Sequence, residues 1–197
     1  MTRPIGPCVH RSEYEVRDVD LATAEELVKF EHYAKGGSNT ATFLHGLFRR
    51  DNFLKCLGVA WWLPPTKAAA QANWHGDPHR VLSLSRLALL PEVPTNGESF
   101  LIGESIRRIK RDGRYDCLLT YADKMQGHKG AIYLATNWKP AGETNAEPVF
   151  HDSSGRMVSR KAGPKTRTRR QMESLGYTMI GTSSKLRFRF ILREVTR

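Results

Sequence analysis

The sequence predicts an α/β domain, in which short apolar strands alternate with helices around a central sheet. Three observations favour this class. Apolar runs with the length of buried strands recur at residues 53–63, 80–90 and 116–121. Helical segments lie between them, and Pro and Gly residues separate the elements. The length of 197 residues and the hydrophobic content of 40% are sufficient for one domain with a buried core.

The first half of the chain is expected to combine two helical segments with three strands. Asp20 is the expected N-cap of the first helix. Pro64 and Pro91 follow the second and third strands, where the absence of an N–H group ends a sheet ladder. The expected elements are, in order, a strand at 14–19, a helix at 21–34, a short helix or loop at 40–49, a strand at 53–63, a connecting segment at 66–79 and a strand at 80–90.

The second half continues the alternation and ends in a basic strand. Gly113 is expected to end one helix, and Pro140 the next. The final run, residues 186–192, alternates apolar and basic side chains with the period of a strand. The expected elements are a loop at 91–97, a helix at 99–111, a strand at 116–121, a helix at 128–138 and a strand at 186–192. We treat residues 1–197 as a single domain.

Composition excludes several classes of protein. The longest apolar run without a charge, residues 56–65, is far shorter than the ~20 residues that a membrane-spanning helix needs. The N-terminal residues lack the apolar stretch of a signal peptide. Three scattered cysteines provide neither a disulfide framework nor a Cys-x-x-Cys metal site. We therefore expect a soluble protein of a reducing compartment, the cytoplasm, with no membrane partner.

The net charge of +11 is concentrated at the C-terminal end. Residues 155–197 carry 12 Lys and Arg against two Asp and Glu, whereas residues 1–154 carry 19 against 18. Such a block favours a polyanionic partner, most simply nucleic acid, over a merely solvated tail. The candidate DNA-binding residues are Lys165, Arg167, Arg169 and Arg170.

The loop at 91–97 leads from a strand into a helix and is a candidate anion site. The N-terminus of a helix carries a partial positive charge and unpaired N–H groups, so it favours an anion such as a pyrophosphate. Small polar residues here would allow close approach. They are Thr95, Asn96, Gly97 and Ser99. No Walker A or Gly-x-Gly-x-x-Gly motif is present, and an ordinary capped helix is the competing interpretation.

A second candidate site follows the strand at 116–121. Asp123 would lie at the end of a buried strand, where open α/β sheets place their ligands. Tyr133, on the next helix, could protonate a leaving group of raised pKa such as a thiolate. In the structural alternative, Asp123 only caps the helix and Tyr133 only fills the core.

Together, the two constellations resemble the GNAT superfamily of N-acetyltransferases. In that superfamily the loop after the fourth strand binds the coenzyme A pyrophosphate, and a Tyr after the fifth strand lies beside its sulfur. The resemblance implies a GNAT-like mixed central sheet flanked by helices, here with a basic C-terminal segment. The usual loop motif is degenerate in this sequence, with Gly97 as its only glycine.

A narrower resemblance is to the Mom family of phage DNA adenine-modification proteins. It covers roughly residues 25–195 and is most specific in the block from Asp123 to Trp138. The other matching segments are Phe30-Glu-His-Tyr33, Leu84-Ser-Arg86-Leu and Ser99-Phe-Leu101. The resemblance implies that Arg86, Asp123, Tyr133 and the pair His32 and Tyr33 are functional.

The resemblance implies an enzyme that transfers a small acyl-derived group, of carbamoylmethyl type, to adenine N6 in DNA and so protects phage DNA from host restriction. The expected donor is acetyl-CoA or a related thioester, and the location is the host cytoplasm. His32, Tyr33 and Asp123 have ligand types suited to a metal, which leaves a metal open. The oligomeric state is open as well, a homodimer included. Two alternatives remain: a GNAT enzyme acting on a tRNA, a protein or a small amine, and a non-catalytic DNA-binding protein on a GNAT scaffold.

Overall fold

A computed structural model describes residues 8–31, 40–162 and 165–194. The chain divides into two compact units, which the sequence analysis does not distinguish within its single domain. The first unit comprises the described residues of Met1–Tyr121, Gly130–Ala141 and Phe188–Arg197. The second comprises those of Ala122–Lys129 and Gly142–Arg187.

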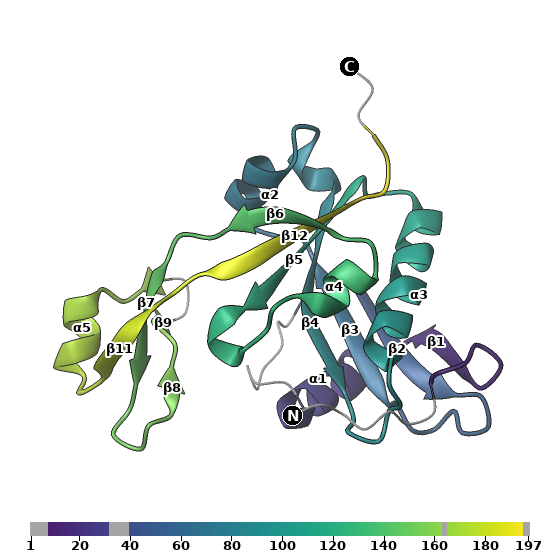
Figure 1. The fold of residues 1–197 in the computed structure, drawn as a ribbon, viewed down its shortest axis with the longest axis horizontal. Coiled ribbons are helices and arrows are strands. Elements are labelled where there is room, and N and C mark those ends of the chain that lie inside the picture. The colour runs from purple at the N-terminus through teal and green to yellow at the C-terminus, as the bar shows by residue number, and fades with distance from the viewer. Residues whose placement is uncertain (1–7, 32–39, 163–164, 195–197) are drawn as a thin grey trace. The chain divides into compact units, whose positions relative to one another are not determined.

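The first unit is built on a mixed seven-stranded sheet with the order β1-β2-β3-β4-β5-β12-β6 (Figure 1). The first four strands pair antiparallel, and β4 pairs parallel with β5. The strands are β1 (Tyr14–Asp18), β2 (Phe43–Arg49), β3 (Gly58–Leu63), β4 (Val81–Leu89), β5 (Cys117–Asp123), β12 (Lys185–Ile191) and β6 (Lys139–Glu143). This architecture confirms the predicted α/β class.

Helices cover both faces of this sheet (Figure 1). They are α1 (Leu21–Glu31), α2 (Lys67–Asn73), α3 (Gly97–Asp112) and α4 (Ala131–Ala135), with a 3₁₀ turn at Pro78–Arg80. Trp61 and Trp62 are successive residues of β3 and point to opposite faces, yet both are 0% exposed. Trp61 packs against Ala24 and Val28 of α1. Among the described residues, no helix is long and apolar enough to cross a membrane.

Several predicted elements differ from the observed ones. The prediction of a helix or loop at 40–49 is wrong, because β2 forms there between β1 and β3. Its residues from His45 to Phe48 are all buried, so the strand shows no alternation of polar and apolar side chains. Residues 66–79, expected as a connection, contain α2, whose N-cap Thr66 accepts a hydrogen bond from the N–H of Ala69.

The helix predicted at 128–138 is shorter than expected and spans only Ala131–Ala135. Gly130 has a φ of 74° and Asn137 a φ of 64°, both in the left-handed region, which a continuous α-helix excludes. At Gly130 a side chain would not fit, because a Cβ there would lie 2.2 Å from Cζ of Phe188. The close approach of Phe188 therefore sets the start of α4.

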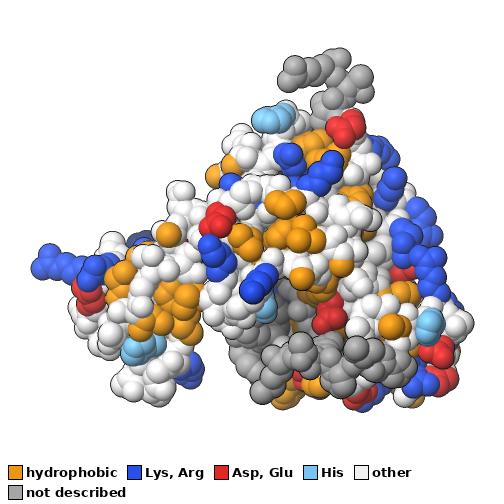
Figure 2. Space-filling view, in the orientation of Figure 1, with side chains coloured by type: hydrophobic (Ala, Val, Ile, Leu, Met, Phe, Trp, Pro, Cys, Tyr) orange, Lys and Arg blue, Asp and Glu red, His pale blue; other side chains and the backbone are white. Residues whose placement is uncertain are grey.

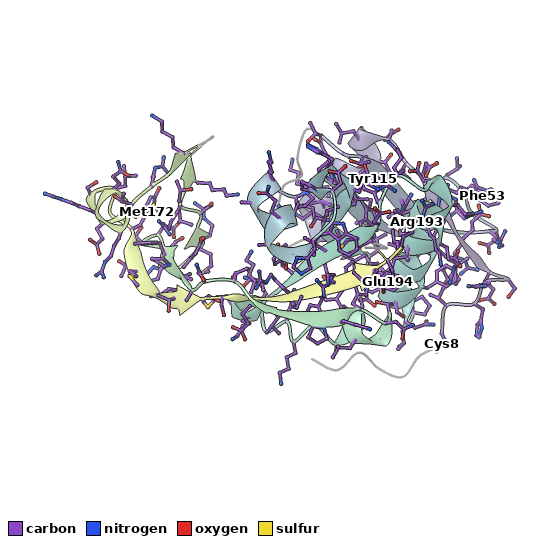
Figure 3. The ribbon with its side chains drawn as sticks, turned by 90° about the horizontal axis from the view of Figure 1, so that it is seen from above. Cys8, Phe53, Tyr115, Met172, Arg193 and Glu194 are labelled. Atoms are coloured by element: carbon purple, nitrogen blue, oxygen red, sulfur yellow. The ribbon has the colours of Figure 1, made fainter. Side chains whose placement is uncertain are left out.

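The second unit contains a small sheet of order β11-β7-β8, a two-stranded ribbon and a short helix (Figure 1). Its elements are β7 (Glu147–His151), β8 (Met157–Val158), β9 (Lys161–Ala162), β10 (Lys165–Thr166), α5 (Arg169–Ser174), β11 (Thr178–Ser183) and the 3₁₀ turn Lys124–Gln126. Phe150 of β7 and Met172 of α5 are 0% exposed and form its core (Figure 3). The sequence predicts a polar loop and a basic stretch here, so these short strands and this helix were not anticipated.

Candidate functional site

The loop before α3 holds the four residues proposed to bind a coenzyme. Asn96 adopts the left-handed conformation, with a φ of 67°, and its carbonyl accepts a 2.9 Å hydrogen bond from Oγ of Ser99. Gly97 packs tightly, since a Cβ there would lie 2.3 Å from Cγ1 of Val93. Gly97 is therefore needed for the packing of the first turn of α3 against this loop.

The side chain of Asn96 does not cap α3, although asparagine is among the best N-cap residues. Instead its Oδ1 accepts a 2.8 Å hydrogen bond from the N–H of Val9, and its Nδ2 donates to the Val9 carbonyl at 3.4 Å. The adjacent Thr95 carbonyl also accepts from Val9, at 3.4 Å. The N-terminal segment at Cys8 and Val9 thus supports the loop (Cys8 is labelled in Figure 3), while the Asn96 side chain makes no capping hydrogen bond to α3.

The strands β4 and β5 stop pairing just before the candidate residue Arg86. Their parallel ladder runs from Val81 paired with Cys117 to Leu84 paired with Thr120, and ends there. On its other side, β4 shifts register against β3, so that Ser85 is bulged out between Leu84 and Arg86. A bulge next to a ladder end re-aims the following side chain and leaves backbone groups without a strand partner on that side. Arg86 occupies this position.

Arg86 is half-buried and folds back along its own strand. Its Nη1 donates to the carbonyl of Ser85 at 2.7 Å and lies 3.2 Å from the Ser85 hydroxyl. The guanidinium carries five N–H donors in a planar fork, a geometry that matches a carboxylate or a phosphate.

Tyr133 lies on α4 within a group of aromatic rings in the first unit. Its ring centroid is 5.8 Å from that of Trp138 and 5.2 Å from that of Phe188. Trp138 in turn stacks on Trp62 at 6.4 Å and contacts Phe190 edge-on at 5.9 Å. These contacts fix the orientation of the phenol ring. This packing is what the core-filling interpretation of Tyr133 expects.

Asp123 belongs to the second unit, at the end of β5. Its Oδ1 accepts a 3.0 Å hydrogen bond from the N–H of Met125 and so caps the turn Lys124–Gln126, as the structural alternative expects. Its Oδ2 lies 3.3 Å from Nζ of Lys185. The side chain is 15% exposed, so one carboxylate is held in place by a backbone donor and an ammonium group and still reaches solvent.

Two neighbouring polar residues of the second unit escaped the sequence analysis, Lys185 and Glu143. Glu143 pairs with Lys124 at 3.1 Å and accepts a 2.6 Å hydrogen bond from Oγ of Ser184. That hydrogen bond and the Lys124 ammonium hold the pKa of Glu143 below its ordinary value. Lys185 is the first residue of β12, one position before the predicted final strand, and its partner Asp123 is 62 positions away in the sequence. No local pattern could have revealed this pair.

The remaining predicted residues divide between the described and undescribed parts of the chain. His32 and Tyr33 lie outside the described residues. Within the described ranges, no group of three His, Cys, Asp or Glu side chains could hold a metal ion. The candidate DNA-binding residues all lie in the second unit, on β10, α5 and the residues between them; they are Lys165, Arg167, Arg169 and Arg170. The loop residues 95–99, Arg86 and Tyr133 belong to the first unit.

Solved structures with the same fold are N-acetyltransferases. The ribosomal-protein-S18-alanine N-acetyltransferase of Escherichia coli aligns with a TM-score of 0.53 at 11% identity, over 93% of this chain and 96% of that one. Spermidine N-acetyltransferase of Vibrio cholerae, solved with CoA and spermine, aligns with a TM-score of 0.54 at 8% identity, over 92% and 97%. An N-acetyltransferase of Staphylococcus aureus Mu50 gives 0.52 at 12% identity, over 91% and 99%. These likenesses establish the GNAT fold.

The family is established by sequence. No curated protein matches this chain. The model of the Mom protein family, however, matches residues 13–194, which include both units and every described candidate residue named above. The chain therefore belongs to the Mom protein family.

Proposed function

We propose that this protein is a phage DNA-modification enzyme that transfers a small acyl group from a thioester to N6 of adenine in DNA, with release of the thiol. The observation that carries the proposal is membership of the Mom family over residues 13–194, on a GNAT fold. The proposed biological effect is protection of the modified DNA from host restriction. The basic second unit supports a DNA substrate through its charge.

The proposed donor is acetyl-CoA or a related thioester, which supplies an activated acyl carbon when bound. The first turn of α3 fits such a group because it follows β4 and its N-cap residue, Asn96, makes no side-chain capping hydrogen bond. Thr95, Gly97 and Ser99 would face the pyrophosphate there. Asn96 would act by holding the loop through Val9.

The side chains of this protein would then accept and donate protons and orient the two substrates. The exocyclic amine of adenine is a weak nucleophile, because its lone pair is delocalised into the ring, and it needs a proton acceptor. Oδ2 of Asp123 is the proposed acceptor, and the Lys185 ammonium holds it in position. The Tyr133 hydroxyl is the proposed proton donor to the departing sulfur. Arg86 would hold an anionic part of either substrate. Because a stacked base hides N6, the adenine has to leave the duplex stack.

The test is mass spectrometry of nucleosides from the DNA of cells that express the protein. Wild type is expected to yield an adenosine of increased mass, and the Asp123→Asn variant to yield almost none. The same cells provide tRNA and protein fractions. A new modification there, with unmodified DNA, would assign the enzyme to another acceptor.

One observation favours a second candidate, a non-catalytic DNA-binding protein on this scaffold. Both carboxylate oxygens of Asp123 already have structural partners, Met125 and Lys185. This candidate predicts DNA binding by the purified protein without consumption of a thioester. A thiol-release assay with acetyl-CoA and DNA separates it from the enzyme.

A further inference from the structure

The second unit carries a segment of concentrated and uncompensated positive charge. Residues 153–172 contain seven Lys and Arg and no Asp or Glu. Ion pairs within the unit engage two of the seven: Arg156 lies 3.1 Å from Asp152, and Arg169 lies 2.7 Å from Glu173. Five cations remain without a carboxylate partner among the described residues. They are Arg160, Lys161, Lys165, Arg167 and Arg170.

Four of these five cations lie on the ribbon formed by β9 and β10. In its antiparallel register Lys161 faces Thr166 and Lys165 faces Ala162. The pairing extends one step further, because the N–H of Arg167 donates to the carbonyl of Arg160 at 2.8 Å. Nε of Arg160 donates in return to the Arg167 carbonyl at 3.0 Å. Two arginines therefore stand directly opposite each other across the ribbon.

Like charges placed directly opposite in an antiparallel pair destabilise it. Within the described residues no acidic side chain relieves this repulsion, although the same unit pairs Arg156 and Arg169 with acids only a few positions away. A bound anion would supply the missing compensation. Lys161, Lys165 and Arg170 are exposed and can reach one, and basic side chains are visible on the surface of this unit in Figure 2.

We propose that this basic ribbon, defined as Arg160, Lys161, Lys165 and Arg167 together with Arg170, docks the second unit on the phosphates of duplex DNA. The inference rests on the proposed function, which makes DNA the substrate. A two-stranded ribbon has the width that a DNA groove admits, and its cations would meet phosphates on the groove walls. Phosphate contacts fix position and affinity but not sequence. The ribbon therefore holds DNA without selecting the adenine to be modified.

The test compares two variants of the full chain that lose the same net charge. The ribbon variant is Lys161→Gln, Lys165→Gln and Arg170→Gln, three exposed residues without ion pairs among the described residues. The control is Arg49→Gln, Arg114→Gln and Arg156→Gln, three arginines whose charge an aspartate already offsets. Binding of a fluorescent duplex is measured by anisotropy at several salt concentrations, and circular dichroism melting confirms that both variants fold.

The ribbon variant is expected to flatten the slope of log K against log salt by about 2.7, or 0.9 for each lost phosphate contact. The control variant should keep the wild-type slope to within about 0.9, the contribution of one phosphate contact. Equal flattening of the slope in both variants would overturn the proposed role of the ribbon, because binding would then depend only on the overall charge of the protein. An unchanged slope in the ribbon variant, with intact wild-type binding, would overturn the ribbon while the proposed function stands. Absence of salt-dependent DNA binding by the wild-type protein would overturn the proposal that DNA is the substrate. Displacement of the duplex by polyglutamate at equal charge concentration would assign the ribbon to an acidic protein instead.

Discussion

Helix α3 of the first unit and helix α5 of the second unit begin in opposite ways. In the first unit α3 begins after Asn96, whose side chain bonds to Val9 and leaves the helix without a side-chain cap. In the second unit α5 begins after Thr168 with a complete capping box. The N–H of Gln171 donates to Oγ1 of Thr168 at 3.3 Å, and the N–H of Thr168 donates to Oε1 of Gln171 at 2.9 Å.

This difference separates two ways of binding an anion. An uncapped first turn offers backbone N–H groups and a helix dipole, which suit a compact phosphate held at one place. In a capped first turn the capping side chain occupies an N–H group, and the second unit instead presents lysine and arginine side chains near α5 that have no carboxylate partner among the described residues. Such side chains suit an extended polyanion. On this basis we propose that the first unit binds the coenzyme and the second binds nucleic acid.

The largest effect is expected from the two candidate catalytic side chains, one in each unit. Asp123→Asn and Tyr133→Phe should each lower DNA modification by about 100-fold or more, the usual scale for a lost acid–base group. Asparagine can still accept from Met125, and phenylalanine keeps the packing against Trp138 and Phe188, so the melting temperature should change little. Nucleoside mass spectrometry and thermal melting of the same purified proteins provide the two readouts.

The matched control for Asp123 is Asp152→Asn. Asp152 is also a capping carboxylate of the second unit, accepting from the N–H groups of Ser154 and Arg156 and pairing with the Arg156 guanidinium. It should retain full activity. If Asp123→Asn is fully active, or if both variants lose stability and activity in parallel, then Asp123 has only its capping role.

A second effect concerns acid stability of the first unit. Burial lowers the pKa of His45 from 6.5 to about 4, and the nearby Arg108 adds to this, while Asp18, 3.6 Å away, opposes it. The folded state therefore binds fewer protons than the unfolded state between these values. Stability should be complete above pH 6.5 and fall by about 3 kcal/mol as the pH drops to 4.

Tryptophan fluorescence during urea unfolding measures this loss in the first unit alone, because all four tryptophans lie there. His45→Asn removes the titrating group and should flatten the pH dependence between 6.5 and 4. An equally steep loss in His45→Asn would assign the acid sensitivity to other groups.

A third, smaller effect tests the support of the coenzyme loop. Asn96→Gly keeps the left-handed backbone but loses both hydrogen bonds to Val9, so ordering of the loop has to accompany binding. Affinity for acetyl-CoA, measured by calorimetry, should fall about tenfold, equivalent to ~1.4 kcal/mol. Asn137→Gly is the control, since Asn137 also has a positive φ in the first unit. Equal affinity in wild type and Asn96→Gly would remove this support from the coenzyme site.

The smallest effect is expected at the other helix start. Thr168→Ala removes the capping box and should cost about 1 kcal/mol of local stability in α5. Hydrogen exchange of the α5 amides would accelerate, while acetyl-CoA affinity and tryptophan-detected unfolding stay unchanged. A loss of coenzyme affinity in Thr168→Ala would contradict the assignment of the coenzyme to the first unit.

Local sequence patterns were sufficient to predict the α/β class and most of the buried strands. The apolar runs that became β3, β4 and β5 are local signals, and so are Asp20 before α1 and Gly113, with a φ of 81°, after α3. A strand with four consecutive buried residues, such as β2, carries no alternation and was missed. The short strands of the second unit were missed because two to six residues contain too little periodicity to detect.

The contacts of the candidate residues, by contrast, depend on the tertiary structure and could not be predicted from the sequence. Asn96 is a natural cap by sequence, but Val9, 87 positions away, takes its side chain. Asp123 meets Lys185, and Arg169 and Arg170 differ only because Glu173 reaches one of them. Sequence patterns report the intrinsic preference of a short segment, whereas hydrogen bonds and ion pairs depend on which distant segments the fold brings within about 3 Å.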